Sequence, residues 1–305
     1  MSGVDLVLGT RGSGLALTQS RWVASQLERA HPGLRVGLRV IRTRGDRLQR
    51  RGAEASPEGL PKGLFTAELE RELLAGSIDL AVHSLKDLPV EDPPGLSVGA
   101  VPARASAHDV LVTRGPAALR DLPAGAVIAT GSPRRKMEIL RVRPDASVVP
   151  IRGNVDTRLS KLRGNAEWQA VVLAEAGIGR LGPDLSGLVV TPIPFEEMLP
   201  APGQGALGVQ IREGDARVRA LVGELDHAPT RLEAGVERAF LRGIGGGCGI
   251  PLGTLARCSA GAITFSARLY GEAGEPREFH GRWAESEAPA RAESMGRAAV
   301  RGREV

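Results

Sequence analysis

Residues 245–253 surround one cysteine, Cys248, with residues that cannot shield it: the stretch reads Gly-Gly-Gly-Cys-Gly-Ile-Pro-Leu-Gly. Glycine has no Cβ atom, so such a loop turns tightly and lets a ligand approach the backbone. A free cysteine is more often a small buried residue, and Cys258, in the apolar run 252–258, fits that description. The glycines around Cys248 instead favour an open loop and a thiol placed to react.

Four short motifs each follow a predicted strand and combine a cation with hydroxyl or glycine backbone donors. They are Thr10-Arg11-Gly12-Ser13, His83-Ser84-Leu85-Lys86-Asp87, Thr130-Gly131-Ser132-Pro133-Arg134-Arg135 and Arg152-Gly153-Asn154-Val155-Asp156-Thr157-Arg158. Ligands of open α/β sheets bind at this edge, and we expect each motif at a helix N-terminus, which favours anions. Ser132 before Pro133 is the pattern of a helix N-cap. One exposed arginine is usually solvated surface, but four such motifs at equivalent positions predict a polyanion site.

The kind of anion follows from what the motifs lack. There is no Walker A sequence and no Gly-x-Gly-x-x-Gly after a strand, which argues against a standard phosphate site. Separate arginines suit several separate carboxylates, which guanidinium groups bind in a bidentate manner.

Asp87 is the acid within this cationic set. Its carboxylate could stabilise a developing cation or take a proton, or it could serve only as a helix cap or as the partner of a lysine. A hydrolytic Ser84/Lys86 pair, with one residue between its two members, is conceivable but disfavoured. His83 is expected to pack or to make a local hydrogen bond.

Composition narrows the function classes. The 305 residues are 42% hydrophobic, which is enough for several cores, and 40 basic against 35 acidic residues give a net charge of +5. Aromatic residues make up only 3%, so a nucleic-acid partner is weakly supported. Two cysteines ten residues apart make no disulfide framework, and no zinc-ligand spacing is present, so no metal is expected. Without an apolar leader or a membrane-length run, we expect a cytoplasmic protein with no membrane partner.

The elements that position these motifs alternate between strands and helices. Strands are expected at 4–8, 36–40 and 80–82 with helices at 22–30 and 65–73, and this order predicts a largely parallel α/β sheet. A second α/β domain is predicted from strands at 110–112, 127–129, 148–151 and 171–173 with helices at 133–141 and 155–163. Residues 43–62 show no period and are expected to form a flexible flap.

The last part of the chain has a different texture. A helix at 230–241 leads to the Cys248 loop, and strands at 252–256 and 262–269 and a final helix follow, which indicates a small α+β domain. Residues 202–205 are expected to return the chain to the first domain. The predicted domains are therefore 1–102 with 203–224, 103–202, and 225–305.

In combination, these motifs resemble the hydroxymethylbilane synthase family, also called porphobilinogen deaminase. The resemblance is carried by the four strand-end motifs together with Lys62-Gly63-Leu64-Phe65, Ala81-Val82 before His83, Leu88-Pro89 after Asp87, Leu159-Ser160-Lys161, Gly203-Gln204-Gly205-Ala206 and Gly246-Gly247-Cys248. It extends from about residue 4 into the third domain. It implies two periplasmic-binding-protein-like (type II) α/β domains plus a small α+β C-terminal domain, in a monomer.

The resemblance also implies an activity. Members of the family are transferases of haem biosynthesis that deaminate four porphobilinogen molecules and condense them head-to-tail into the linear tetrapyrrole hydroxymethylbilane. A dipyrromethane cofactor, attached to the loop cysteine through a thioether, is the primer. Carried over by position, Cys248 is the attachment point and Asp87 is the catalytic carboxylate. The remaining cofactor-binding residues are Ser13, Lys86, Thr130, Ser132, Arg134 and Arg135, and the substrate-binding residues are Arg11, Arg152, Arg158 and Arg180.

Three positions depart from the family pattern. Gly131 stands where a second serine is usual, Gly245 replaces an acidic residue, and Gly249 replaces a glutamine. Two other classes of protein fit less well. A solute-binding protein of the same fold would need no thiol in an open loop, and a cysteine-dependent hydrolase would need a histidine beside Cys248, whereas none lies close in the sequence.

Overall fold

The computed structural model describes residues 4–43, 66–246, 249–271 and 274–301. The chain divides into two compact units: unit 1 comprises Met1–Arg104 and Ala206–Arg231, and unit 2 comprises Ala105–Gly205 and Leu232–Val305. Among the described helices, none has both the length and the apolar composition needed to cross a membrane.

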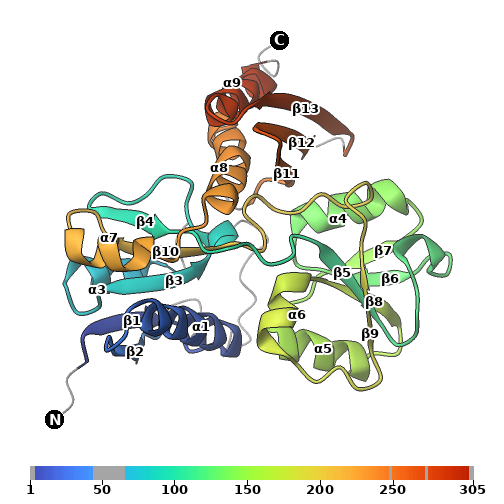
Figure 1. Ribbon diagram of the computed structural model, residues 1–305. Helices are drawn as coiled ribbons and strands as arrows, with labels where there is room; N and C mark the ends of the chain where they lie inside the picture. The colour runs from blue at the N-terminus through green and yellow to red at the C-terminus, as the bar shows by residue number, and fades with distance from the viewer. Residues whose placement is uncertain (1–3, 44–65, 247–248, 272–273, 302–305) are drawn as a thin grey trace. The chain divides into compact units, whose positions relative to one another are not determined.

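Unit 1 is built on a five-stranded sheet with the order β2-β1-β3-β10-β4 (Figure 1). Its elements are β1 Leu6–Thr10, α1 Gly14–Ala30, β2 Val36–Val40, α3 Ala67–Leu74, β3 Leu80–Ser84, the 3₁₀ turn η1 Leu85–Asp87, β4 Leu96–Ala100, β10 Leu207–Arg212 and α7 Ala216–Gly223. Strands β1, β2 and β3 are parallel, and β10 runs antiparallel to both of its neighbours.

Alternation along the strands of unit 1 divides its core between the two faces of the sheet. Leu6 and Leu8 of β1 pack with residues of α1, whereas Val7 between them packs with residues of α3. This is the period-two pattern of a strand whose two faces are both covered. The strand ends that carry the motifs are thereby fixed between two helical layers.

Unit 2 begins with a second five-stranded sheet, of order β7-β6-β8-β5-β9. Its elements are β5 Asp109–Thr113, the 3₁₀ turn η2 Leu119–Asp121, β6 Val127–Ala129, α4 Pro133–Val142, β7 Ser147–Val149, α5 Val155–Gly164, β8 Trp168–Ala174, α6 Glu175–Leu181 and β9 Val189–Pro192. Helix α4 covers one face and helices α5 and α6 the other (Figure 1). Here β5 is the reversed strand, so the two sheets share one topology.

The rest of unit 2 is an antiparallel meander with two helices on it. It consists of α8 Ala228–Gly243, β11 Leu252–Ser259, β12 Ala262–Tyr270, β13 Pro276–Ala284 and α9 Ala288–Arg301. Every second residue of β12, from Ile263 to Leu269, is buried in a core that also contains Phe240 of α8 and Ala292 of α9. One face of this sheet is thus covered by both helices (Figure 1).

Most predicted elements are present, and the prediction missed four strands and two short helices among the described residues. The helices expected at 133–141, 155–163 and 230–241 are α4, α5 and α8. Strands β4, β9, β10 and β13 and helices α6 and α7 were not predicted. The expected flap at 43–62 lies, apart from Thr43, outside the described residues, and the three domain boundaries stay a prediction.

Candidate active site

Two of the four motifs lie in unit 1, at the ends of neighbouring strands. Strands β1 and β3 are parallel partners, with Leu8 opposite Leu80, so the segments that follow them emerge at the same edge. Ser13 is the N-cap of α1, where its Oγ accepts a hydrogen bond of 3.4 Å from the backbone N–H of Ala16. Arg11 is half-buried beside it. The first motif therefore has the predicted geometry at a helix N-terminus.

The second motif differs from the prediction. Lys86 and Asp87 lie on η1, a single 3₁₀ turn, and Leu88 after it is extended. A turn of three residues aligns too few peptide dipoles to attract anions, so the expected helix N-terminus is wrong at this position. Asp87 also does not cap a helix. Its side chain is exposed and forms no ion pair within the described residues, so the carboxylate is available to a ligand.

His83 precedes this turn on β3 and is buried. Burial is the main cause that lowers its pKa to about 4; the neighbouring Gln210 side chain opposes the shift, and the charge of Arg11 adds to it. The imidazole is therefore neutral at physiological pH. This agrees with a packing role and not with that of an acid.

The other two motifs lie in unit 2 at the ends of β6 and β7, which are parallel neighbours. Ser132 caps α4 by accepting a 3.4 Å hydrogen bond from Arg135 N–H, and Pro133 is the first helical residue, as predicted. Thr130 is buried, and its Oγ1 accepts a hydrogen bond of 3.2 Å from Ser132 N–H. These hydroxyls thus set the shape of the turn before α4.

The packing around Gly131 gives a reason for one of the three departures from the family pattern. A Cβ atom at this position would lie 2.6 Å from the carbonyl oxygen of Ile151. Real Cβ atoms essentially never approach a backbone oxygen so closely, and the oxygen cannot move away as a flexible side chain could. In this chain, therefore, glycine lets the turn after β6 contact the segment after β7, and a serine would require that turn to shift.

Arg134 and Arg135, for which the sequence predicts carboxylate binding, have an acidic partner within the protein. Both are buried and share the carboxylate of Asp109, which is itself fully buried at the start of β5. Arg134 Nη1 lies 2.7 Å from Asp109 Oδ2, and Arg135 Nη2 lies 2.7 Å from Oδ1. Gln204 Nε2 donates to the same Oδ1 at 3.0 Å. One carboxylate therefore balances part of the charge of two arginines.

Asp109 and Gln204 were missed by the sequence reasoning. The only sign of a buried carboxylate in the sequence was weak: Asp109 directly precedes four strand residues, Val110 to Thr113, all of which are buried. A carboxylate in such a strand needs charged or polar partners to remain ionised. Those partners are 25, 26 and 95 residues away in the sequence.

Arg158 and Arg180 are the clearest anion-binding candidates. Neither forms an ion pair in the part of the chain that the structure describes. Arg158 donates to Gly153 O at 2.8 Å, and Arg180 donates to Gly205 O at 2.6 Å. Burial lowers the pKa of each guanidinium to about 10, and the charge of Arg135 contributes to the shift of Arg158. An anionic ligand would relieve this cost.

Two further observations fit a ligand with several carboxylates. The Nε of Arg134 is buried and has no hydrogen-bond partner among the described residues. Arg152 is exposed at the end of the β7 segment, where its carbonyl oxygen accepts a hydrogen bond from Lys161 Nζ at 3.1 Å. Among these described side chains, Arg134 therefore keeps one buried donor that a ligand could use.

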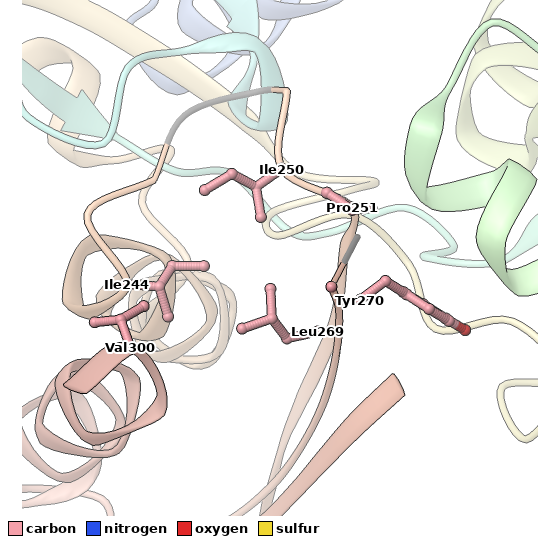
Figure 2. A pocket seen from close by; sticks show the side chains of 7 residues that line it. Ile244, Ile250, Pro251, Leu269, Tyr270 and Val300 are labelled. Carbon is pink, nitrogen blue, oxygen red and sulfur yellow. The ribbon is translucent and has the colours of Figure 1, made fainter. Parts of the chain in front are cut away.

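Cys248 lies outside the described residues, but the segments on either side of it are defined. Ile250, whose side chain leaves no room for a Cβ atom at Gly246, lines an apolar cavity of about 270 Å³. Figure 2 shows the side chains around it, which come from Ile244, Ile250, Pro251, Leu269, Tyr270 and Val300. The predicted open loop thus has an apolar base.

Cys258 behaves as expected for a packing residue. It is half-buried on β11 against the C-terminal core. Burial, together with the charges of Glu233 and Glu285, raises the pKa of its thiol. A raised pKa keeps the thiol protonated and poorly nucleophilic.

Taken together, the fold and the site define an α/β protein of the periplasmic-binding-protein type. It has two such domains and a small C-terminal domain, and cations and hydroxyls gather at the strand ends. Within the described residues, no group of three or more histidine, cysteine or acidic side chains could hold a metal ion.

The comparisons with known proteins identify the family. Residues 6–220 match the porphobilinogen deaminase dipyrromethane cofactor binding domain, and residues 231–300 match the porphobilinogen deaminase C-terminal domain. The chain belongs to the porphobilinogen deaminase family, whose members are the hydroxymethylbilane synthases, transferases of tetrapyrrole synthesis.

Individual relatives cover most of the chain. It is 47% identical to the porphobilinogen deaminase of Thermus thermophilus over 251 residues, which are 82% of this chain and 80% of the relative. It is 46% identical to that of Desulforudis audaxviator over 263 residues, 86% of this chain and 83% of the relative. Among solved structures, an amino acid ABC transporter substrate-binding protein from Streptococcus pneumoniae is 14% identical with a TM-score of 0.39, over 72% of this chain and 86% of that one.

Proposed function

We propose that the chain deaminates four porphobilinogen molecules and joins them head-to-tail on a dipyrromethane primer held by Cys248, releasing hydroxymethylbilane. The observation that supports this best is the state of Arg158 and Arg180, half-buried cations whose pKa is lowered by burial and which have no ion pair in the described chain. Porphobilinogen and the primer carry acetate and propionate groups, and carboxylates are the bidentate partners that guanidinium groups bind best.

The donor set fits the primer and the substrate. The primer's carboxylates are bound by cationic and hydroxyl side chains: Ser13, Lys86, Thr130, Ser132, Arg134 and Arg135. The buried, unsatisfied Nε of Arg134 is one atom that such a carboxylate would satisfy. The substrate's carboxylates are bound by Arg11, Arg152, Arg158 and Arg180. When bound, the primer supplies a pyrrole α-carbon as the nucleophile.

Asp87 is the catalytic carboxylate. Loss of ammonia from the aminomethyl carbon of porphobilinogen leaves a positive charge on the substrate, and the exposed carboxylate of Asp87 stabilises that charge near the pyrrole nitrogens. Because no ion pair within the described residues occupies Asp87, its negative charge is available for this purpose. The neutral His83 behind it adds no competing positive charge.

We further propose that the protein acts as a monomer in the cytoplasm without a nucleic-acid partner, since aromatic stacking residues are few and two cysteines ten residues apart make no disulfide framework. Sedimentation velocity at micromolar concentration would give the mass of one chain. A mass of two chains would contradict the monomer.

Intact-mass measurement tests the attachment. Freshly purified protein should exceed the mass of the bare chain by two linked pyrroles. Cys248→Ser should remove the adduct, and the matched control Cys258→Ser should retain it, because the raised pKa of the Cys258 thiol makes it a poor nucleophile. A folded wild-type protein with the bare mass would refute the proposal, and so would an adduct that disappears in Cys258→Ser.

A further inference from the structure

Glu138 is a fully buried carboxylate that the proposed chemistry does not use. It lies on α4, one turn after Arg134, so both side chains are on the same face of the helix. Its Oε2 accepts hydrogen bonds from Arg268 Nη1 at 2.6 Å and from Tyr270 Oη at 2.8 Å, both on β12. Its Oε1 accepts a bond of 3.3 Å from Leu199 N–H.

The partners of Glu138 are themselves held in place. Arg268 is 7% exposed, and its Nε donates to Glu278 Oε1 on β13 at 2.8 Å. Burial and, after it, the charge of Glu138 raise the pKa of Tyr270, so the phenol keeps the proton that it donates. A buried carboxylate is tolerated only when it is well paired, and this one has Tyr270 and two arginines as donors: Arg268 and, at 3.3 Å through its Nε, Arg141.

Close backbone packing accompanies this cluster. Gly253 on β11 lies opposite Arg268, and a Cβ atom there would lie 2.7 Å from Leu199 Cβ and 3.0 Å from Glu138 Oε1. Next to it, Thr254 N–H donates to Pro200 O at 2.8 Å. The C-terminal sheet therefore contacts α4 and the 199–200 segment without room for an intervening side chain.

The same cluster reaches the base of the cysteine loop. Tyr270 lines the apolar cavity together with Ile250 and Pro251, which follow Cys248 by two and three residues. In Figure 2 the phenol oxygen points away from the other labelled side chains, and this is the atom that donates to Glu138. The backbone of Tyr270 also binds the loop, since its N–H donates to Pro251 O at 3.1 Å.

We propose that Glu138 is a positioning residue for the transferase reaction: through Arg268 and Tyr270 it fixes the C-terminal sheet, and with it the base of the cysteine loop, relative to the arginines at the start of α4. The inference rests on the proposed function, in which that loop carries the primer and Arg134 and Arg135 bind its carboxylates. Misplacement of reacting groups by about 1 Å can cost on the order of 100-fold in rate.

The test compares turnover of porphobilinogen per adduct-bearing enzyme at a temperature well below the unfolding midpoint of every variant. Glu138→Gln keeps the shape and removes the charge, and we expect kcat to fall by roughly tenfold to 100-fold with a smaller change in KM. In Glu138→Gln/Arg268→Gln two neutral amides can bond to each other, so kcat should recover part of that loss. Tyr270→Phe removes one hydroxyl from an otherwise intact cluster and should lower kcat by roughly threefold.

The matched control is Glu293→Gln, which removes a carboxylate that pairs with Arg242 at 3.0 Å inside the C-terminal domain. It should leave kcat unchanged. The inference is overturned if Glu138→Gln and Tyr270→Phe lower only the unfolding midpoint, or if Glu293→Gln slows turnover as much as Glu138→Gln does. If the wild-type protein carries the adduct and turns over porphobilinogen, and Glu138→Gln has the same rate, only the positioning role is overturned. A wild-type protein with neither adduct nor turnover overturns the proposed function as well.

Discussion

Replacing Asp109 by asparagine should destabilise unit 2 more than the loss of any surface ion pair. The side chain of Asp109 is fully buried, and its two oxygens lie 2.7 Å from Arg134 Nη1 and 2.7 Å from Arg135 Nη2. Asparagine has nearly the same volume but carries no charge, and its amide nitrogen would face one of the guanidinium groups. Two buried cations would then lose their shared counter-charge.

The magnitude follows from the burial of all three groups. Removing one partner of a buried ion pair costs about 3 to 5 kcal/mol, because the remaining charge is left without compensation. The hydrogen bonds that Arg134 donates to Leu199 O and that Arg135 donates to Val172 O persist, so we expect a value within this range. At a urea dependence of about 3 kcal/mol per molar, the unfolding midpoint should fall by roughly 1 to 1.7 M.

Trp168 on β8 reports on the same sheet, so urea unfolding should be followed by its fluorescence with Trp22 and Trp283 replaced by phenylalanine. The control is Asp145→Asn, which removes the carboxylate of the more exposed pair with Arg143 and should change the midpoint little. A shift of less than about 0.3 M for Asp109→Asn, or equal shifts for the two variants, would refute the view that Asp109 balances a buried charge.

Three further outcomes are expected. Asp87→Asn should lower kcat by about 100-fold to 1000-fold with KM nearly unchanged, and a loss confined to KM would remove Asp87 from the catalytic role. Arg158→Ala should raise KM for porphobilinogen by roughly tenfold or more without lowering the unfolding midpoint. The reason is that it deletes a half-buried cation that has no ion pair in the described chain. A large loss of stability would contradict this expectation. The pKa of His83 is lowered to about 4 in the folded protein, against about 6.5 in the unfolded chain, so between these pH values the unfolded state binds more protons than the folded state. As the pH falls through this window, the free energy of unfolding should therefore decrease, by at most about 3 kcal/mol. His83→Gln should flatten this dependence in urea unfolding at several pH values, whereas exposed His280→Gln should retain it.

Features set by neighbouring residues could be predicted from the sequence. The cap at Ser132 and the start of α4 at Pro133 depend on only four residues, and both are present. The spacing of apolar residues in α5 and α8 predicted both helices, and the predicted ends differ from the observed ends by at most two residues. Local patterns carry this information because capping and helix formation depend on contacts three or four residues apart.

Features set by distant partners could not be predicted in the same way. The pairing of Arg134 and Arg135 with Asp109 could not be predicted, because Asp109 lies more than twenty residues before these helix residues, on strand β5. Glu138 gave no signal at all, since its partner Arg268 is 130 residues away. The helix predicted at Asp87 is absent for a different reason. A short 3₁₀ turn has no apolar period, so the sequence does not distinguish it from the first turn of an α-helix.

The position of β10 has a consequence for the order in which the chain folds. This strand lies between β3 and β4 in the sheet of unit 1, yet more than a hundred residues separate it from β4 in the sequence. During synthesis, β4 therefore leaves the ribosome without its neighbour, while all five strands of the unit 2 sheet, from Asp109 to Pro192, have already been made when β10 begins at Leu207. Because domains fold as their segments become available, the unit 2 sheet can close first. Until β10 has been made and pairs with β3, the edge of β3 remains open to pairing with other chains.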